Sequence, residues 1–514
     1  MAIVAGVDFG TASVRVSLFE GERGRLGSGS APYPTLRRRG EPDFATQRHE
    51  DHCRALEAAF SAALADSKVP GEAIAALAID TTGSTVVPVD EQLQPLDDYY
   101  LWCDHRAWRE AAEITSRARE RGLAHLNWCG GFYSSEWGFA KVLHWLRSNP
   151  AKRGRFYTAL EHCDYMTATL CGITEPLRVP RSVCAMGHKW MWNQSLGGLP
   201  DEDFLCAVDP LLAGLRDRLA GNYTTSRHIA GALSAQWAQR LGLRAGIPIP
   251  TGALDAHWDA VGAGCRVGDI VNVVGTSTCI MALAREPVLI PGVCGVVSGS
   301  IDPDAVGVEA GLSAVGDLFD AIARRAQSDT GTLSARLSGY RPGQTGMLRF
   351  AWDNGDRCIL GNAQMRGVTL GWRLQHTAED ELFAAIEGTA FHTRIILDRL
   401  REFGIPTDRL IHAGGIPQRN PTLNRIYANV FGKPVLVPKS DITSLGSAIF
   451  AFLAAEVFDS LEQAQTAMSP GYDVVEPDTA DTATYEDLYA RFRDLYFSLS
   501  EAAPQWANLG PADA

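Results

Sequence analysis

Features that would place this chain of 514 residues in several common protein classes are missing from it. No segment approaches the ~18 uninterrupted apolar residues of a membrane span. The first residues lack the basic start and the long apolar stretch of a secretory signal. The 11 cysteines are an odd number without a Cys-x-x-Cys pair, which favours free thiols in a reducing compartment. The sequence therefore predicts a soluble, cytoplasmic enzyme.

Basic residues are also in short supply. The chain has 47 Lys and Arg residues against 60 Asp and Glu residues, so its formal net charge is −13. The longest basic run, Arg37–Arg39, lies between Pro34 and Gly40 and is interpreted as a solvated loop. The acidic balance argues against nucleic acid or a membrane surface as the main partner. It leaves room for an anionic ligand that is held by a few local donors.

Standard motifs for phosphate, dinucleotide and zinc binding are missing as well. There is no Gly-x4-Gly-Lys-Ser/Thr loop and no His-Glu-x-x-His pair, and the glycines of segment 262–268 miss the dinucleotide spacing. The cluster His49–Cys53 precedes a helical run, so it is interpreted as the solvated start of a helix rather than a metal site. Any nucleotide would need a different kind of phosphate-binding segment.

The residues that are present predict an α/β fold. The chain is 46% hydrophobic and 21% charged, which is ordinary for a globular protein, and its length suggests two or three domains. Ile3–Val7 reads as a buried strand, and Ser13–Phe19 alternates with period two, as an antiparallel partner would. A helix is expected at Asp51–Leu64 and a strand at Ala75–Asp80.

An internal repeat divides the chain into two related halves. Gly10-Thr11-x-Ser13 matches Gly275-Thr276-x-Thr278, and each follows one β-rich run and precedes another. A boundary at the Pro- and Gly-rich stretch 246–250 gives domains 1–249 and 250–514. The halves differ at one position, because Asp8 precedes the first glycine by two residues where the second half has Val273.

The C-terminal half contains further expected elements. A strand ending near Gly414 precedes a helical stretch that runs from Asn420 through Val430. Another helix opens near Thr443, and Tyr485–Tyr496 has the periodicity of a closing helix that packs on the core. The acidic stretch Pro470–Thr484 has no clear pattern and is expected to be a surface connection.

Each Gly-Thr turn could bind phosphate. A turn between two strands exposes successive backbone N–H groups and a hydroxyl, which can hold phosphate oxygens without a lysine. A plain hairpin turn is the alternative for either one alone. The duplication, together with Asp8, favours phosphate. A carboxylate at the end of a buried strand needs a cation, and Mg²⁺ bound to a nucleotide fits that need.

Two more segments could take part in chemistry. Gly414-Gly415, between a strand and a helix, would let a flat ligand approach the backbone, although an ordinary strand–helix turn explains it equally. Asp255 stands just after the expected boundary with small neighbours, where it could lie between ligands held by the two halves. A helix N-cap is the alternative role for Asp255, and both can hold together.

Taken together, these segments resemble the FGGY family of carbohydrate kinases, and the resemblance covers nearly the whole chain. It rests on the first phosphate motif at Asp8–Arg15, the second at Val274–Thr278, the adenosine motif at Ala413–Ile416 with Asn420, and the catalytic segment Gly252–Asp255. The resemblance implies two actin-like (ribonuclease H-like) ATPase domains with a cleft between them. It also implies ATP, Mg²⁺ held by Asp8 through water, Asp255 as the catalytic base, and nucleotide contacts at Gly10, Thr11, Ser13, Arg15, Gly275, Thr276, Gly414, Gly415 and Asn420.

Within the family, the L-ribulokinases are the most similar. The matching segments are Asp80–Thr85, Leu101–His105, Tyr133–Trp137, Gly187–Lys189 and Gly307–Gly311. This resemblance implies a ketopentose site lined by Gly83, Trp102, Lys189, Asp255 and Glu309. It further implies conversion of L-ribulose to L-ribulose 5-phosphate, as in arabinose catabolism. Without it, Lys189 would be read as a surface lysine, Glu309 as a local cap and Trp102 as a core residue.

Some features depart from the family pattern, and other functions stay open. The segment between Gly311 and Trp352 is short, and no proline follows Arg357. Both departures lie in the C-terminal half and bear on substrate choice. The alternatives are a kinase of the same family for D-ribulose, xylulose, ribitol or glycerol, an actin- or Hsp70-like ATPase, and a non-catalytic sugar sensor. A homodimer is compatible with a chain of this kind.

Overall fold

The N-terminal half is built on a five-stranded mixed sheet. The structure is a computed structural model that describes residues 2–506. The strand order is β14-β6-β1-β2-β3, in which β1, β2 and β3 are antiparallel and β6 and β14 run parallel to β1. These strands are β1 (Ile3–Phe9), β2 (Ser13–Glu20), β3 (Gly24–Pro32), β6 (Ile74–Thr81) and β14 (Ala253–Leu254).

The C-terminal half repeats this topology in a larger sheet. The order is β17-β18-β16-β15-β21-β22-β23, and the inner five strands match the N-terminal sheet in order and direction. These strands are β15 (Asp269–Val274), β16 (Thr278–Ala284), β17 (Gly295–Ser298), β18 (Val306–Leu312), β21 (Arg409–Ala413), β22 (Val435–Pro438) and β23 (Tyr472–Val475). The predicted duplication of a strand–Gly-Thr turn–strand unit is therefore confirmed.

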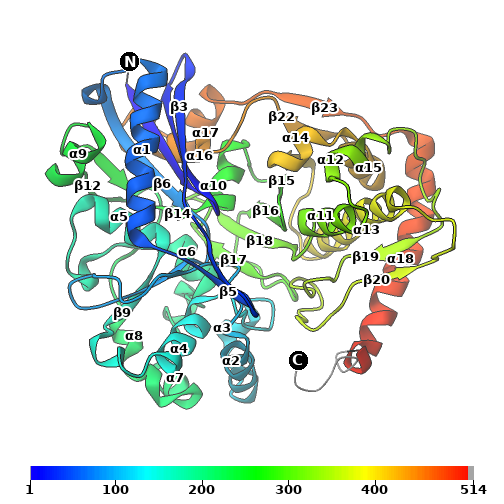
Figure 1. The fold of residues 1–514 in the computed structure, drawn as a ribbon, viewed down its shortest axis with the longest axis horizontal. Coiled ribbons are helices and arrows are strands. Elements are labelled where there is room, and N and C mark those ends of the chain that lie inside the picture. The colour runs from blue at the N-terminus through cyan, green and yellow to red at the C-terminus, as the bar shows by residue number, and fades with distance from the viewer. Residues whose placement is uncertain (1, 507–514) are drawn as a thin grey trace.

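Helices cover both faces of the N-terminal sheet. Alternate residues of β1 point to opposite sides, as the period of a strand requires. Ala5, Val7 and Phe9 pack with apolar side chains of α1 (His49–Ser67) on one face. Val4 packs with those of α16 (Leu445–Ala454) on the other face. Gly6 has no side chain where the start of α16 lies against the strand. The second face of the first sheet is thus covered by a helix from the other half of the chain (Figure 1).

Smaller sheets and further helices fill the rest of the two halves. A second five-stranded sheet has the order β4 (Leu36–Arg38), β5 (Glu41–Gln47), β8 (Tyr99–Tyr100), β7 (Val86–Val89), β9 (Thr158–Glu161). Paired short strands are β10 (Arg181–Ser182) with β11 (Tyr223–Thr224), β12 (Ile229–Ala232) with β13 (Pro248–Pro250), and β19 (Leu348–Phe350) with β20 (Val368–Leu370). The remaining helices are α2 (Trp108–Glu120), α3 (Ala124–Asn127), α4 (Gly138–Ser148), α5 (His162–Cys171), α6 (Val183–Lys189), α7 (Glu202–Val208), α8 (Leu215–Arg218), α9 (Ala235–Leu241), α10 (Asp255–Gly262), α11 (Gly316–Arg325), α12 (Thr330–Ala335), α13 (Ala378–Glu402), α14 (Gly415–Arg419), α15 (Pro421–Phe431), α17 (Leu461–Ala467) and α18 (Thr479–Trp506).

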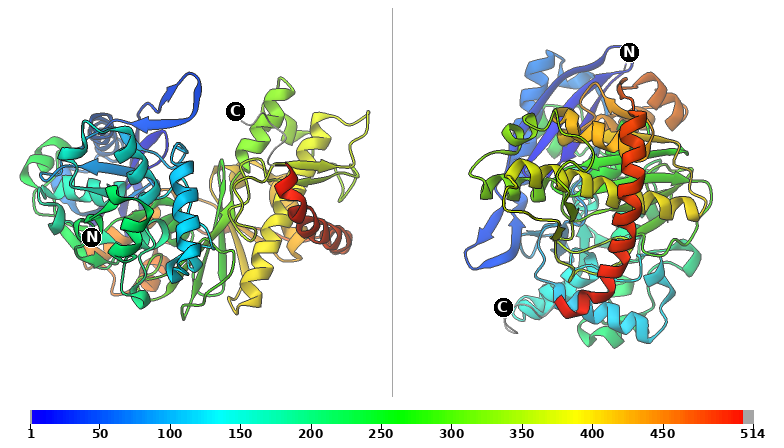
Figure 2. Two further views of the ribbon diagram at one scale, coloured as in Figure 1. Left: turned by 90° about the horizontal axis from the view of Figure 1, so that it is seen from below. Right: turned by 90° about the vertical axis from the view of Figure 1, so that its right-hand side faces the viewer.

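The two halves form two bodies that meet along the middle of the molecule. In the left-hand view of Figure 2 the N-terminal body carries the orange α16 and α17, and α18 lies on the outer side of the C-terminal body. No helix within residues 2–506 is long and apolar enough to cross a membrane. All 11 cysteines are free thiols.

The structure confirms most of the expected elements and corrects two expectations. The cluster His49–Cys53 forms the first turn of α1, so the helix start is confirmed, but the cluster is not solvated as a whole, because His52 and Cys53 are buried. The stretch Pro470–Thr484 is not merely a surface connection, because it contains β23 and the first turn of α18. The boundary between 1–249 and 250–514 remains a prediction. The N-terminal sheet takes its edge strand β14 from beyond that boundary.

Candidate active site between the two domains

The first Gly-Thr turn, Gly10–Ser13, is held from three sides. The Gly10 N–H donates to the Ser13 carbonyl over 3.0 Å, and the Tyr33 hydroxyl donates to the Gly10 carbonyl over 2.5 Å. The Gln47 side chain donates to the Thr11 carbonyl over 2.7 Å. The side chain of Thr11 is left at the surface. The turn is therefore rigid while its hydroxyl stays accessible to a ligand.

Two carboxylates lie side by side next to this turn. Asp8 and Asp80 are register partners on β1 and β6, and both are buried. Arg15 of β2 places its Nε 3.2 Å from Asp8 Oδ2, and Ser447 of α16 donates to Asp80. Burial raises the pKa of both carboxyl groups, and for Asp80 the charge of Asp8 raises it further. Two acids crowded in this way favour a bound cation.

The second Gly-Thr turn, Gly275–Ser277, is neutral. Its Gly275 N–H donates to the Ser277 carbonyl over 2.9 Å. The Gly275 and Thr276 carbonyls accept N–H groups from Val315, Gly316 and Asp317 at distances of 2.9 to 3.1 Å, at the start of α11. The position that corresponds to Asp8 is Val273, whose register partner on β21 is Ala413. The second turn therefore offers backbone groups without a carboxylate.

A cavity of about 430 Å³, here called the smaller cavity, opens beside the second turn. Four residues with an expected nucleotide role line it: Gly275, Thr276, Gly415 and Asn420. Asn420 caps α15 by accepting the Leu423 N–H over 3.0 Å, and it also donates to Ser334. Gly414 lies just behind the lining, where a Cβ would come 2.5 Å from the Val274 carbonyl at a φ of 91°. This position requires glycine.

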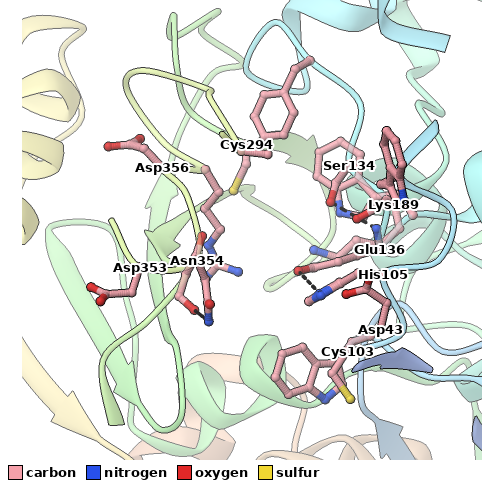
Figure 3. A pocket seen from close by; sticks show the side chains of 18 of the residues that line it. Asp43, Cys103, His105, Ser134, Glu136, Lys189, Cys294, Asp353, Asn354 and Asp356 are labelled. Atoms are coloured by element: carbon pink, nitrogen blue, oxygen red, sulfur yellow. Dashed lines mark hydrogen bonds and ion pairs between the residues drawn. The ribbon is translucent and has the colours of Figure 1, made fainter. Parts of the chain in front are cut away.

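A cavity of about 480 Å³, here called the larger cavity, lies between the two halves. Three of the residues expected at the ketopentose site line it: Trp102, Lys189 and Glu309. Figure 3 shows Asp353, Asn354 and Asp356 on one wall and His105, Glu136 and Lys189 on the opposite one. The segment Ser313–Asp320 contributes residues to both cavities, which places them next to each other.

A buried charge cluster forms one end of the larger cavity. The Lys189 Nζ of α6 lies 2.8 and 2.9 Å from the two carboxylate oxygens of Glu309 on β18. His188 and His257 place ring nitrogens 3.3 and 3.4 Å from the same carboxylate. Although burial acts to raise it, the pKa of Glu309 is held well below its usual range by Lys189 and His257. Glu309 is therefore an ionised acceptor that joins the two halves.

Asp255 begins α10 at the end of the short strand β14. Its Oδ1 accepts the Ala256 N–H over 2.7 Å. The alternative of a helix N-cap is wrong, because Leu254 holds the N-cap position and Asp255 is the first residue of the helix. Burial, followed by the charge of Asp8, raises the pKa of Asp255 to about 7. Gly83 packs directly against this segment, since a Cβ there would lie 2.7 Å from the Leu254 side chain. Neither Gly83 nor Asp255 lines the larger cavity itself.

Three further residues of the larger cavity were not singled out by the sequence. His105 and Glu136 form an ion pair of 3.5 Å on the N-terminal side. Arg357 lines the C-terminal side, and its guanidinium donates to the Thr278 carbonyl. All three stand in segments that the resemblance covers, but nothing in their spacing indicates that they share a cavity.

The comparisons with known proteins agree over nearly the whole chain. Residues 3–262 match the N-terminal domain, and residues 270–455 the C-terminal domain, of the FGGY family of carbohydrate kinases. Curated proteins called ribulokinase are 32% identical in Vibrio parahaemolyticus and 33% in Shouchella clausii, each over 96% of this chain and 95% of the relative. A solved xylulose kinase from Rhodospirillum rubrum superposes with a TM-score of 0.79 at 21% identity, over 98% of this chain and 99% of that one.

Two duplicated sheets with an adjacent pair of cavities, together with both domain matches, lead to one conclusion. The chain belongs to the FGGY family of carbohydrate kinases.

Proposed function

We propose that this chain transfers the γ-phosphoryl group of ATP to the terminal hydroxyl of L-ribulose. As a member of its family it is an ATP-dependent sugar kinase. The choice of sugar is supported by the relatives called ribulokinase, which are 32–33% identical over 96% of the chain. The observation that carries the proposal is the wall Ser313–Asp320, which the two cavities share. A sugar and a nucleotide in adjacent cavities would have their reacting ends close together.

The smaller cavity suits the nucleotide. Gly275 and Thr276 would hold phosphate oxygens, while Gly415 and Asn420 would lie along the adenosine. The first turn would close over the phosphates from the opposite side, with Thr11 and Arg15 as donors. Phosphoryl transfer depends mainly on such positioning and on charge stabilisation. Two turns on two bodies provide both once the domains approach each other.

The larger cavity suits a polyhydroxylated substrate. Glu309 is an ionised acceptor, and Lys189 has one N–H beyond its two bonds to that carboxylate. Trp102 adds a flat apolar wall. The terminal hydroxyl of the sugar would then point toward Asp255, which accepts its proton as the hydroxyl oxygen attacks the γ-phosphorus. The raised pKa of Asp255 suits a group that must gain and lose a proton near neutral pH.

The residues beside the first turn fit Mg²⁺. The donors are carboxylate oxygens, which this ion prefers, and Asp80 Oδ1 is buried without a hydrogen-bond partner among the described residues. Asp8 would hold the ion through water. When bound, Mg²⁺ supplies positive charge to the phosphates of the nucleotide. The remaining work of alignment and proton transfer belongs to the chain itself.

Two further properties belong to this proposal. The free thiols and the membership of a sugar kinase family support a cytoplasmic location. A homodimer is compatible with this function, and light scattering at micromolar concentration would measure the assembly directly.

The deciding experiment follows ADP release with Mg-ATP and a panel of L-ribulose, D-ribulose, the two xyluloses, ribitol and glycerol. We expect a clear preference for L-ribulose in kcat/KM and little ADP release without sugar. Activity confined to another member of the panel would keep the kinase mechanism and replace the substrate. Folded protein without any sugar-stimulated turnover would favour the sensor or ATPase alternatives.

A further inference from the structure

A buried lysine lies behind the larger cavity. Lys141, in the first turn of α4, is 1% exposed. Its Nζ donates to the carbonyls of Ser84 and Leu101, each over 2.6 Å, and to that of Tyr100 over 3.4 Å. All three of its hydrogen bonds go to backbone oxygens. A buried ammonium is unfavourable unless its surroundings need the charge, and a methionine would fill the same space without that penalty.

The three carbonyls belong to two segments that reach the proposed sugar site. Ser84 follows Gly83, whose turn packs on Leu254 directly before the proposed base. Leu101 precedes Trp102, which lines the larger cavity. One ammonium group therefore fastens the turn beside the base to the loop that forms the cavity wall.

The same loop reaches the first Gly-Thr turn. The Trp102 indole N–H donates to the Thr11 hydroxyl over 3.1 Å. Through Leu101 and Trp102, the position of the Lys141 ammonium is thus connected to the turn that would hold phosphate. Displacements of about 1 Å at such positions can reduce rates roughly 10²-fold, because the reacting atoms must be aligned.

We propose that Lys141 is a positioning residue of the sugar site, which sets the distance between the cavity wall at Trp102 and the turn at Gly83. The inference rests on the proposed sugar site but not on which sugar fills it. Lys141 touches no substrate and acts only through the two loops. Its loss should therefore weaken sugar binding more than nucleotide binding, because the smaller cavity, which would hold most of the nucleotide, lies in the other body.

The test is Lys141→Met, with Lys152→Met as the matched control. Lys152 also donates to a backbone carbonyl of the same half, that of Leu96 over 3.1 Å, and it pairs with Asp97. Unlike Lys141 it is exposed, and neither of these partners lines the larger or the smaller cavity. We expect the KM for the sugar to rise at least tenfold in Lys141→Met and the KM for ATP to stay within twofold. The control should match the wild type in both. An unchanged sugar KM, or an equal rise in both KM values, would overturn the proposal.

A second measurement uses the unmodified enzyme, so it does not depend on the folding of a variant. Burial lowers the pKa of Lys141 to about 8, although the negative charges of nearby groups act to raise it. These groups are Asp104, Glu161, Glu136 and Cys103. Above that pH the lysine loses its charge and holds the carbonyls less strongly. The sugar KM should then rise several-fold between pH 7 and 9, with little change in the KM for ATP. A flat sugar KM over this range would count against the positioning role.

These results separate the inference from the function on which it rests. Wild-type protein that turns over no sugar in the panel would refute the proposed function. Normal wild-type turnover with an unaffected Lys141→Met variant would refute only the role of Lys141.

Discussion

The two Gly-Thr turns have the same scaffold and opposite electrostatics. Each joins the first two strands of its sheet, and the five strands of the first sheet match the inner five of the second in order. At the first turn the register partners on the central strands are Asp8 and Asp80, whereas at the second they are Val273 and Ala413. The turns also differ in length, because Gly10 bonds to Ser13 and Gly275 bonds to Ser277. A duplicated unit has thus become acidic in one half and apolar in the other.

The difference indicates how one scaffold can hold two parts of a single ligand. Buried carboxylates are unfavourable by themselves, so the acidic half is suited to a cation and the phosphates it neutralises. The second turn has no buried carboxylate beside it and offers backbone groups to the phosphates, while Gly414-Gly415 would let the flat adenosine approach the backbone. The following predictions test this division of labour.

The largest effect is expected close to the acidic turn, in Asp255→Asn, because Asp255 is near enough to Asp8 to be affected by its charge. The amide cannot accept the proton of the sugar, so turnover should fall roughly 10²–10⁴-fold. The side chain keeps its size and its bond to the Ala256 N–H, so the melting temperature should change little. Steady-state kinetics with L-ribulose and thermal unfolding measure both quantities. Near-normal turnover would refute the assigned role.

The next effect is on the cation. Asp8→Asn makes the first turn more like the second, and the apparent affinity for Mg²⁺ should fall by about 10–100-fold, as expected for a ligand that acts through water. The measurement is the change in protein fluorescence when the nucleotide binds, recorded at a series of Mg²⁺ concentrations. Asp66→Asn, which removes an exposed carboxylate that only bonds the Ser28 N–H, is the control. Equal Mg²⁺ affinities in the two variants would contradict the proposal that the acidic first turn, through Asp8, binds the cation.

A smaller effect is expected at the neutral half, in Gly414→Ala. A methyl group there meets the Val274 carbonyl at a left-handed φ, and strain of one to two kcal/mol corresponds to a factor of about 5–30. The KM for ATP should rise by this factor while the sugar KM stays constant. Gly404→Ala is the control. Gly404 has a similar φ of 79° but open space around it, so this variant carries the cost of the left-handed backbone without the clash. A rise in the sugar KM alone would contradict the assignment of this half to adenosine.

The last effect, which is small near neutral pH, is the pH dependence of the wild type. Asp255 must be deprotonated to act as a base, and its pKa is raised to about 7 in the free chain. A bound cation would lower it, so the rate should fall about tenfold for each pH unit below an inflection at or below pH 7. The residual rate of Asp255→Asn should not show this fall in rate at low pH. A residual rate of Asp255→Asn that falls with decreasing pH in parallel with the wild type would exclude Asp255 as the titrating group.

Much of this arrangement could be predicted from sequence, because it depends on short local patterns. The strands around Gly10 and Gly275 have clear periodicity, and their duplication predicted two related sheets. The edge strand β23 was missed because edge strands bury little and Val474 is half exposed. No pattern within one segment could show that His105 and Arg357 line one cavity, since more than 200 residues separate them. The expected roles of the site residues remain predictions.

The position of α16 has a consequence for how the chain is made. One face of the N-terminal sheet is covered by Leu445–Ala454, so it stays exposed until that helix leaves the ribosome. At about 5–20 residues per second, synthesis from the end of β6 to the end of α16 takes roughly 20–75 s. During that time the apolar face around Val4 and Ala76 is open to solvent and to chaperones. A fragment that ends at residue 249 would keep this face uncovered permanently and should aggregate.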